Sequence, residues 1–277
     1  MIRYALPTFF SFALVVLLYS CGAEKVNDGL PGGSTTEGAG GERNATVQAK
    51  RQRYRIVNTF AHDTSAFTQG LAIDNGQFIE TTGLAGKSSI RRVDIPSGKV
   101  IRKVDYTYQF FGEGVCILNG KAYAVTWLNQ TGFIFDASTL KQEATFTYMG
   151  EGWGLTTDGT SLYLSNGSNI ITRRDPVDFH QLGVINVTLD GSPLRDINEL
   201  EWVNGEIWAN VWKTENIARI DPATGVVTGL VELAGIFPEE EKSANVDVMN
   251  GIAYDATTGA IYVTGKHWPW VYQIVVE

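Results

Sequence analysis

The sequence predicts an all-β fold, a five-bladed β-propeller, and three observations support this prediction. A short phrase recurs five times along the chain: one polar or aromatic residue, then Gly in four of the five copies, then an apolar stretch. Each copy is followed by a turn signal and a second apolar run, and the copies lie about 40–50 residues apart, the period of propeller blades. The copies begin at Gln69, Glu113, Trp153, Asn198 and Asn250.

Each repeat is expected to form four antiparallel strands, the first two joined by a tight hairpin. Mirror-image hairpin turns need a positive φ, which Asn and Gly tolerate, and Asn-Gly or Asp-Gly signals follow the phrase. In the second repeat the predicted strands are 114–118, 122–127, 132–136 and 142–148. In the fourth they are 198–203, 206–211, 216–221 and 226–233. Nothing reads as a helix of about ten or more residues with 3.6-residue periodicity.

The fifth repeat has only three predicted strands, because its third strand, 271–276, reaches the C-terminus. An unpaired strand, 55–60, stands ahead of the first repeat. Pairing this N-terminal strand with the last blade would close the ring and cover an exposed sheet edge. We therefore expect one propeller domain over residues 51–277.

The N-terminal segment has the features of an export signal. Residues 1–20 contain Arg3 followed by an apolar centre at 13–19, too short to span a membrane. The segment ends in Leu-Tyr-Ser-Cys21, which resembles the lipobox of bacterial lipoproteins and makes Cys21 the expected lipidation site. Ordinary cleavage nearby is the alternative. Residues 22–50, rich in Gly, Ser and Thr, are then a flexible tether. We expect an exported lipoprotein, facing the periplasm or anchored in the outer membrane through the lipid alone.

Composition limits the partners. The chain of 277 residues has a net charge of −8 and a sequence pI of about 5.0. No Lys/Arg stripe is present, which argues against nucleic acid as a partner. A closed propeller has no evident need of other chains, so we expect a monomer.

The repeats also predict where a site would lie. The start of the first strand and the end of the second meet at one end of each blade, so ten side chains are expected around one channel mouth. The first strands supply Gln69, Glu113, Trp153, Asn198 and Asn250, and the second strands supply Glu80, Trp127, Asn166, Trp212 and Lys266. Two carboxylates, an ammonium group, four amides and three indoles are typical of a small-ligand pocket.

Structural interpretations of these residues stay open. The tryptophans could pack between blades, the 112–114 Gly-Glu-Gly segment could be a turn, and Asn166 and Asn250 could cap strand ends. Glu80 and Lys266 could form a structural ion pair, and Gln69 could satisfy backbone groups.

Other kinds of site have little support. The three histidines are scattered at His62, His180 and His267 without the spacing of metal ligands, so no metal site and no cofactor are expected. No phosphate-binding Gly-rich loop and no Gly-x-Ser-x-Gly elbow occur.

Ten segments running in order through nearly all of 55–277 carry a resemblance to a known family. They are 67–71, 80–83, 111–114, 151–155, 165–168, 198–201, 207–212, 220–222, 250–254 and 263–269. At these residues the chain resembles the glutamine cyclotransferase family of plant and bacterial type, which is a five-bladed propeller.

The resemblance implies that the protein cyclises an N-terminal glutaminyl residue of small peptides to pyroglutamate with loss of ammonia, without a metal. It implies that Glu80 is the acid/base, with Lys266 and Asn198 as further catalytic residues. The substrate-binding residues that it implies are Gln69, Phe67, Trp127, Trp153 and Trp212.

Two other functions remain open from the sequence. One is a lipid-anchored propeller that binds peptide or sugar without chemistry, because indoles also stack on sugars. The other is a calcium-dependent lactonase-type hydrolase, with Glu80, Asn166, Asn198 and Asn250 on a channel metal, although Lys266 would oppose a cation there.

Overall fold

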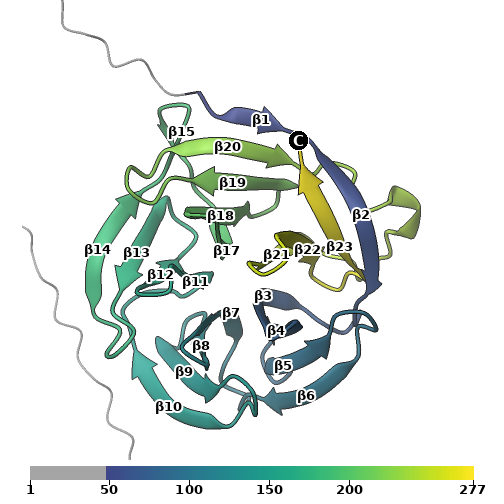
Figure 1. Cartoon of the computed structure of the whole chain (residues 1–277). Coiled ribbons are helices and arrows are strands. Elements are labelled where there is room, and N and C mark those ends of the chain that lie inside the picture. Colours follow the sequence, from purple (N-terminus) through teal and green to yellow (C-terminus); the bar gives the residue numbers. More distant parts are fainter. Residues whose placement is uncertain (1–47) are drawn as a thin grey trace, which may run out of the picture. The chain divides into compact units, whose positions relative to one another are not determined.

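A computed structural model describes residues 48–277 and confirms a five-bladed β-propeller, whose blades form a ring (Figure 1). Blade one is β3 (Thr68–Asp74), β4 (Gln77–Thr82), β5 (Ser89–Asp94) and β6 (Val100–Asp105). Blade two is β7 (Gly112–Leu118), β8 (Lys121–Thr126), β9 (Thr131–Asp136) and β10 (Gln142–Thr147). Blade three is β11 (Leu155–Thr157), β12 (Leu162–Ser165), β13 (Ile170–Arg174) and β14 (Gln181–Asn186). Blade four is β17 (Ile197–Val203), β18 (Glu206–Val211), β19 (Asn216–Ile220) and β20 (Val227–Glu232). These bounds agree closely with the strands predicted for the second and fourth repeats.

Blade five closes the ring in the way the sequence predicts. It contains β21 (Met249–Asp255), β22 (Ala260–Gly265) and β23 (Trp270–Val276), and its outer strand is β2 (Tyr54–Ala61). The strands β2 and β23 run antiparallel, with Tyr54 opposite Val276 and Ala61 opposite Trp270. The N-terminal strand therefore supplies the hydrogen-bond partners that the last edge would otherwise lack.

Four short elements were not predicted. The strand β1 (Lys50–Gln52) runs parallel to β20 on the outside of blade four, ahead of the predicted strand at 55–60. A hairpin of β15 (Thr188–Leu189) and β16 (Ser192–Pro193) precedes blade four, and one 3₁₀ turn, η1 (Glu239–Glu241), precedes blade five. The predicted signal, Cys21 and most of the predicted tether lie outside the described residues. Within residues 48–277 no helix has the length and apolarity needed to cross a bilayer.

The core is divided into five hydrophobic clusters, and each lies between two neighbouring blades. Ile171 and Leu200 meet between blades three and four, and Cys116 lies between blades two and three, as a buried thiol whose pKa burial raises well above its usual range. The closing interface between blades five and one has the same construction, with Leu71 packed near Val271. The ring is thus closed by burial of apolar surface as well as by strand pairing.

The glycine of the repeated phrase is explained by the inner strands. A Cβ at Gly114 would lie 2.4 Å from the Leu155 nitrogen, and one at Gly154 would lie 2.1 Å from the Asn198 oxygen. Only Gly allows adjacent blades to approach so closely. In blade four the equivalent residue is Glu199, whose carboxylate accepts hydrogen bonds from the backbone N–H groups of Leu71 and Ile252 at 3.2 and 2.9 Å. This residue therefore ties blade four to blades one and five.

Candidate active site

A cavity of about 190 Å³ lies where the inner strands begin, and every blade contributes to it. Its lining residues are Phe67, Gln69, Phe111, Glu113, Trp127, Trp153, Asn198, Trp212 and Lys266. Seven of the eight residues predicted to act on or bind substrate are in this set, Glu80 being the exception. All nine come from the start of an inner strand, the loop before it or the residue after a second strand. The repeat predicted the first and the last of these positions, but not the loop residues Phe67 and Phe111.

Aromatic side chains form the cavity walls. The rings of Phe67 and Phe111 meet edge to face at 6.2 Å, and Phe111 meets Trp127 in the same way at 5.7 Å. On another part of the wall Trp153 and Trp212 meet at 5.4 Å and 85°. Such contacts fix the rings and exclude water from the polar groups between them. The wall is apolar, as expected of a pocket that desolvates its ligand.

The carboxyl group of Glu113 is the buried acid of this cavity. Its side chain is only 5% exposed, and its Oε1 accepts a hydrogen bond of 3.0 Å from Gln69. Gln69 is supported in turn by Asn250, whose amide donates to the Gln69 side-chain and backbone oxygens. Burial raises the pKa of Glu113 well above its usual range, while the nearby Lys266 acts in the opposite direction. A carboxyl whose pKa is raised in this way is suited to general acid–base chemistry.

Lys266 and Asn198 complete the polar part of the site. Lys266 follows β22, is 5% exposed, and holds its ammonium group 4.7 Å from the centre of the Phe67 ring. Burial lowers the pKa of Lys266, and the negative charge of Glu113 works against this shift. The Oδ1 atom of Asn198 is buried and has no partner among the described residues. Unpaired buried polar atoms that face a cavity are available to a ligand.

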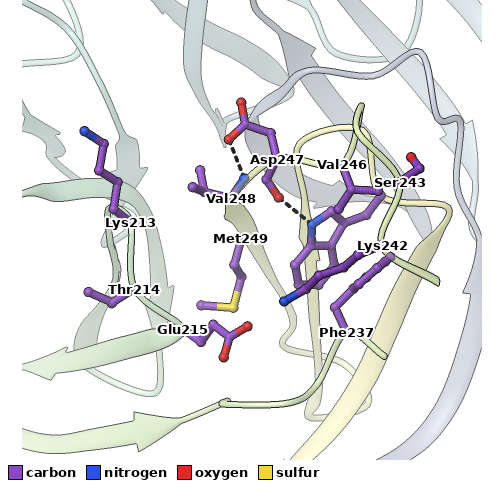
Figure 2. Close-up of a pocket in the computed structure, with 11 residues that line it drawn as sticks. Lys213, Thr214, Glu215, Phe237, Lys242, Ser243, Val246, Asp247, Val248 and Met249 are labelled. Atoms are coloured by element: carbon purple, nitrogen blue, oxygen red, sulfur yellow. Dashed lines mark hydrogen bonds between the residues drawn. The ribbon is translucent and has the colours of Figure 1, made fainter. Parts of the chain in front are cut away.

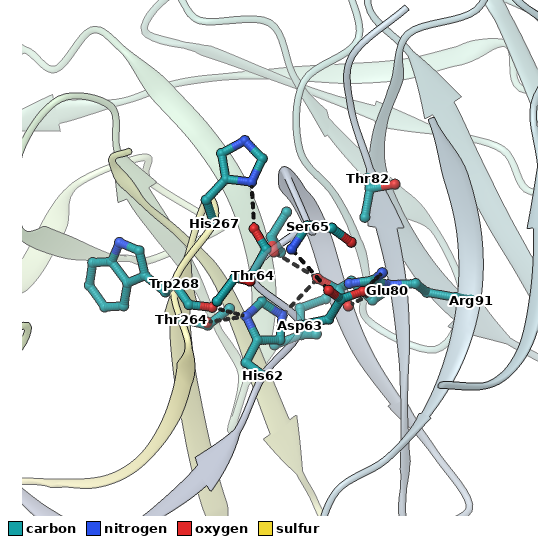
Figure 3. A network of polar contacts seen from close by, with 12 residues as sticks. His62, Asp63, Thr64, Ser65, Glu80, Thr82, Arg91, Thr264, His267 and Trp268 are labelled. Carbon is teal, nitrogen blue, oxygen red and sulfur yellow. Dashed lines mark hydrogen bonds and ion pairs between the residues drawn. The ribbon is translucent and has the colours of Figure 1, made fainter. Parts of the chain in front are cut away.

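The expectation that Glu80 faces this cavity is wrong. Glu80 lies within β4, opposite Leu71 and Arg91, and is 1% exposed. Figure 3 shows its carboxylate inside a network of polar contacts, where it accepts from Arg91 at 2.9 Å, Thr68 at 2.7 Å and His62 at 3.0 Å. Burial alone would raise the pKa of Glu80, but the charges of Arg91 and His62 hold it far below its usual range.

The strand ends explain this error. The residue that follows the second strand is Trp127 in blade two, Trp212 in blade four and Lys266 in blade five, but in blade one it is Gly83. A Cβ at Gly83 would lie 2.4 Å from the Phe111 ring, so this Gly makes room for the aromatic wall. Glu80 lies inside the strand, and its side chain points between blades.

The same network fixes the loop before β3. Both ring nitrogens of His62 face acceptors, since Nδ1 lies 2.8 Å from the Trp268 carbonyl and Nε2 lies 3.0 Å from Glu80. A neutral imidazole has only one N–H, so this geometry favours the imidazolium form. Burial would lower the pKa of His62, but Glu80 raises it. The network thereby joins the Phe67 loop to the turn that carries Lys266.

Two further residues that were predicted to surround the channel mouth, Asn166 and Asn250, do not line the cavity. Asn166 is exposed and accepts a hydrogen bond from the Ser168 hydroxyl at 2.6 Å, as a turn residue would. Asn250 is fully buried and donates hydrogen bonds to the backbone and side-chain oxygens of Gln69 without lining the cavity. The four side chains considered as calcium ligands therefore do not converge on one point.

Among residues 48–277 a second hollow and a cluster of ionisable side chains stand out, but the ionisable groups of both are exposed or only half-buried. A larger groove of about 550 Å³ lies between the Lys213 turn and the loop before β21 (Figure 2). Both acidic side chains of this groove already accept backbone hydrogen bonds, Asp247 from the Val248 N–H and Glu215 from the Gly235 N–H. Among residues 48–277 one group could hold a metal, Asp175, Asp178 and His180, and it lies away from the cavity.

Sequence reasoning missed the roles of Glu113 and Phe111, although a signal was present. The segment Phe111-Gly-Glu113-Gly repeats the pattern of Phe67-Thr-Gln69-Gly, with an aromatic residue two places before the polar one. In both blades the aromatic residue enters the wall and the polar residue enters the cavity.

Among residues 48–277 the fold and the site together define a β-propeller with a buried, aromatic-walled pocket that holds a carboxyl group and an amine. The chain belongs to the glutamine cyclotransferase family, whose sequence model matches residues 33–276. It is 43% identical over 228 residues to the glutaminyl-peptide cyclotransferase of Arabidopsis thaliana, an alignment that covers 80% of this chain and 71% of that protein. The crystal structure of Myxococcus xanthus glutaminyl cyclase is similar, with a TM-score of 0.78 and 32% identity over 83% of this chain and 99% of that chain.

Proposed function

We propose that the protein is a glutaminyl-peptide cyclotransferase that converts the N-terminal glutamine of peptides to pyroglutamate and releases ammonia without a metal ion. Membership of the glutamine cyclotransferase family supports the reaction. The observation that carries the mechanism is that two buried ionisable groups, Glu113 and Lys266, line the same aromatic-walled cavity.

Glu113 is the proposed acid and base. The α-amine of the substrate attacks the γ-amide carbon of its own side chain, which forms the ring C–N bond and moves an electron pair to the amide oxygen. Glu113 takes the proton that the amine loses and returns it to the departing nitrogen, so the C–N bond to ammonia breaks with no net proton change. Proton transfer of this kind typically contributes about 10²–10⁴-fold. Glu113 replaces Glu80 in this role, because Glu80 is held by Arg91 and His62.

Lys266 is the proposed stabiliser of the negative oxygen. An ammonium group that is fixed in a dry cavity before the reaction begins lowers the barrier more than one in water would. Asn198 is placed to accept from the substrate amine through its unpaired Oδ1. Gln69 already donates to Glu113, so its first task is to orient the acid.

The size of the cavity supports a single-residue ligand. A volume of about 190 Å³ is below the roughly 300–1,000 Å³ of sites for drug-sized ligands. The walls of Phe67, Trp127, Trp153 and Trp212 would press the glutaminyl side chain back toward its own amine, which favours ring closure. The following residues of the peptide would remain outside.

One assay tests this function against the two alternatives. We expect the purified protein to release ammonia from a Gln-initiated dipeptide equally with and without EDTA, with pyroglutamyl product seen by mass spectrometry. Release that EDTA abolishes would overturn the metal-independent mechanism, and EDTA-sensitive opening of a lactone would favour the hydrolase. Binding of peptide without any product would favour the non-catalytic propeller.

For the N-terminal segment we propose export and lipidation at Cys21, on sequence grounds alone. The protein would then act as a monomer tethered to a membrane through its lipid. In a bacterial host, metabolic labelling with a fatty acid should mark the wild type and not Cys21→Ala. Equal labelling of both would contradict the assignment.

A further inference from the structure

Glu151 bridges two walls of the cavity although it is not one of its lining residues. Its Oε2 atom accepts a hydrogen bond from the indole N–H of Trp127 at 2.7 Å and another from that of Trp153 at 2.9 Å. Glu151 lies in the connection from β10 to β11, whereas Trp127 follows β8, so the carboxylate joins blades two and three. Hydrogen bonds to an ionised acceptor are stronger than neutral ones.

The aromatic wall has a gap that Glu151 spans. Phe67, Phe111 and Trp127 form one series of edge contacts, and Trp153 and Trp212 form another. The two series are joined through the shared carboxylate oxygen. Trp127 is 38% exposed, so packing alone restrains this indole less than a core side chain. The bridging hydrogen bonds are therefore a main determinant of its orientation.

The negative charge of Glu151 also affects the pKa of Glu113, the buried acid of the cavity. Three titratable groups lie around Glu113: Lys266, which lines the same cavity, Glu151, whose carboxylate holds two indoles of the cavity wall, and Tyr148, which follows the last strand of blade two. Burial makes the largest contribution to the raised pKa of Glu113, Lys266 lowers this pKa and Glu151 raises it. Burial raises the pKa of Tyr148 to about 12, so its hydroxyl is neutral at the working pH.

We infer that Glu151 is a positioning residue, which holds the indoles of Trp127 and Trp153 at the separation that fits a glutaminyl side chain. The same carboxylate places a negative charge near Glu113. The inference rests on the proposed cyclotransferase function. It assigns two separable tasks to one carboxylate: a hydrogen-bond task toward the indoles and a charge task toward the acid.

Two variants separate these tasks. Glu151→Gln keeps an oxygen that can accept from the indoles but removes the charge, and Glu151→Ala removes both. Glu241→Gln is the matched control, because Glu241 accepts a 2.6 Å hydrogen bond from the Trp270 indole outside the cavity. KM and kcat for a Gln-initiated dipeptide are measured against pH, together with tryptophan emission and acrylamide quenching of the free enzyme.

For Glu151→Ala we expect KM to rise about tenfold or more, with altered emission and quenching, because two indoles lose their acceptor. For Glu151→Gln we expect KM within about twofold of the wild type. The acid limb of its kcat/KM profile should move to lower pH by roughly 0.5–1 unit, because loss of a negative neighbour lowers the pKa of Glu113. Glu241→Gln should leave KM and the pH profile unchanged.

Unchanged KM and unchanged quenching in Glu151→Ala would overturn the positioning role. An unshifted acid limb in Glu151→Gln would overturn the charge role. If the wild type itself forms no pyroglutamate, the proposed function fails, but the quenching comparison still tests whether Glu151 holds the indoles.

Discussion

Replacement of Glu80 by Gln distinguishes a structural carboxylate from a catalytic one. Glu80 is 1% exposed and touches two cations, Arg91 and His62. The Gln side chain keeps the shape but removes the charge, which leaves the two cations buried with Asp63, 35% exposed, as the remaining carboxylate in the network.

The magnitude follows from the burial of these groups. Removing one partner of a buried ion pair typically costs about 3–5 kcal/mol, because the remaining charge is uncompensated. In a domain of this size each kcal/mol lowers the melting temperature by about 2–4 °C. We therefore expect Glu80→Gln to melt roughly 6–20 °C below the wild type at neutral pH.

The loss should depend on pH in a definite direction. The pKa of Glu80 is lower in the folded state than its ordinary 4.5, so its stabilising effect is fully present above that value. The effect is lost as the pH falls toward the folded-state pKa. The difference in melting temperature between wild type and Glu80→Gln should therefore shrink as the pH is lowered below about 4.5.

Differential scanning calorimetry from pH 3 to 8 measures this difference, and ammonia release is assayed well below both melting temperatures. Glu277→Gln is the control, because Glu277 forms an exposed 3.5 Å pair with Arg55 and exposed pairs contribute little. We expect the folded Glu80→Gln enzyme to keep its turnover within about threefold. An unchanged melting temperature with no turnover would refute this reasoning and restore Glu80 as the acid/base.

Two further substitutions test other parts of the molecule. Lys266→Ala should lower kcat by about 10²–10³-fold with a smaller change in KM, because the lost ammonium group acts on the developing oxyanion. Steady-state kinetics measure this effect, with Lys121→Ala at an exposed site as the control. An unchanged kcat would exclude the proposed role of Lys266. Glu199→Ala leaves the buried N–H groups of Leu71 and Ile252 without acceptors, and each unsatisfied group costs about 1–3 kcal/mol. The free energy of unfolding, measured by denaturant titration, should therefore fall by roughly 2–6 kcal/mol. A loss below about 1 kcal/mol would contradict the bridging role of Glu199.

The architecture was predictable because one repeat determines it. The copies of the phrase place the inner strands, and the unpaired strand before Thr68 has one available edge, at β23. The strand β1 was not predictable, because three residues carry no periodic signal and its pairing depends on a distant contact of Ala49 with Asp190.

The site residues were predictable only where a residue's position within its blade determines the direction in which its side chain points. Trp127, Trp212 and Lys266 follow the last residue of a second strand and enter the cavity. Glu80 precedes that point by three residues, and the pleat turns its side chain between blades. The end of β4 is defined by its pairing with β3 and β5, which the sequence around Glu80 does not reveal.

The most direct test is the turnover of Glu113→Gln, a substitution that preserves shape at the acid of the cavity. With Gln69 still able to donate to an amide oxygen, we expect the melting temperature to stay within a few degrees of the wild type. The kcat for pyroglutamate formation should fall by at least about 100-fold. Wild-type turnover in the folded Glu113→Gln protein would contradict the assignment of this pocket as the catalytic centre.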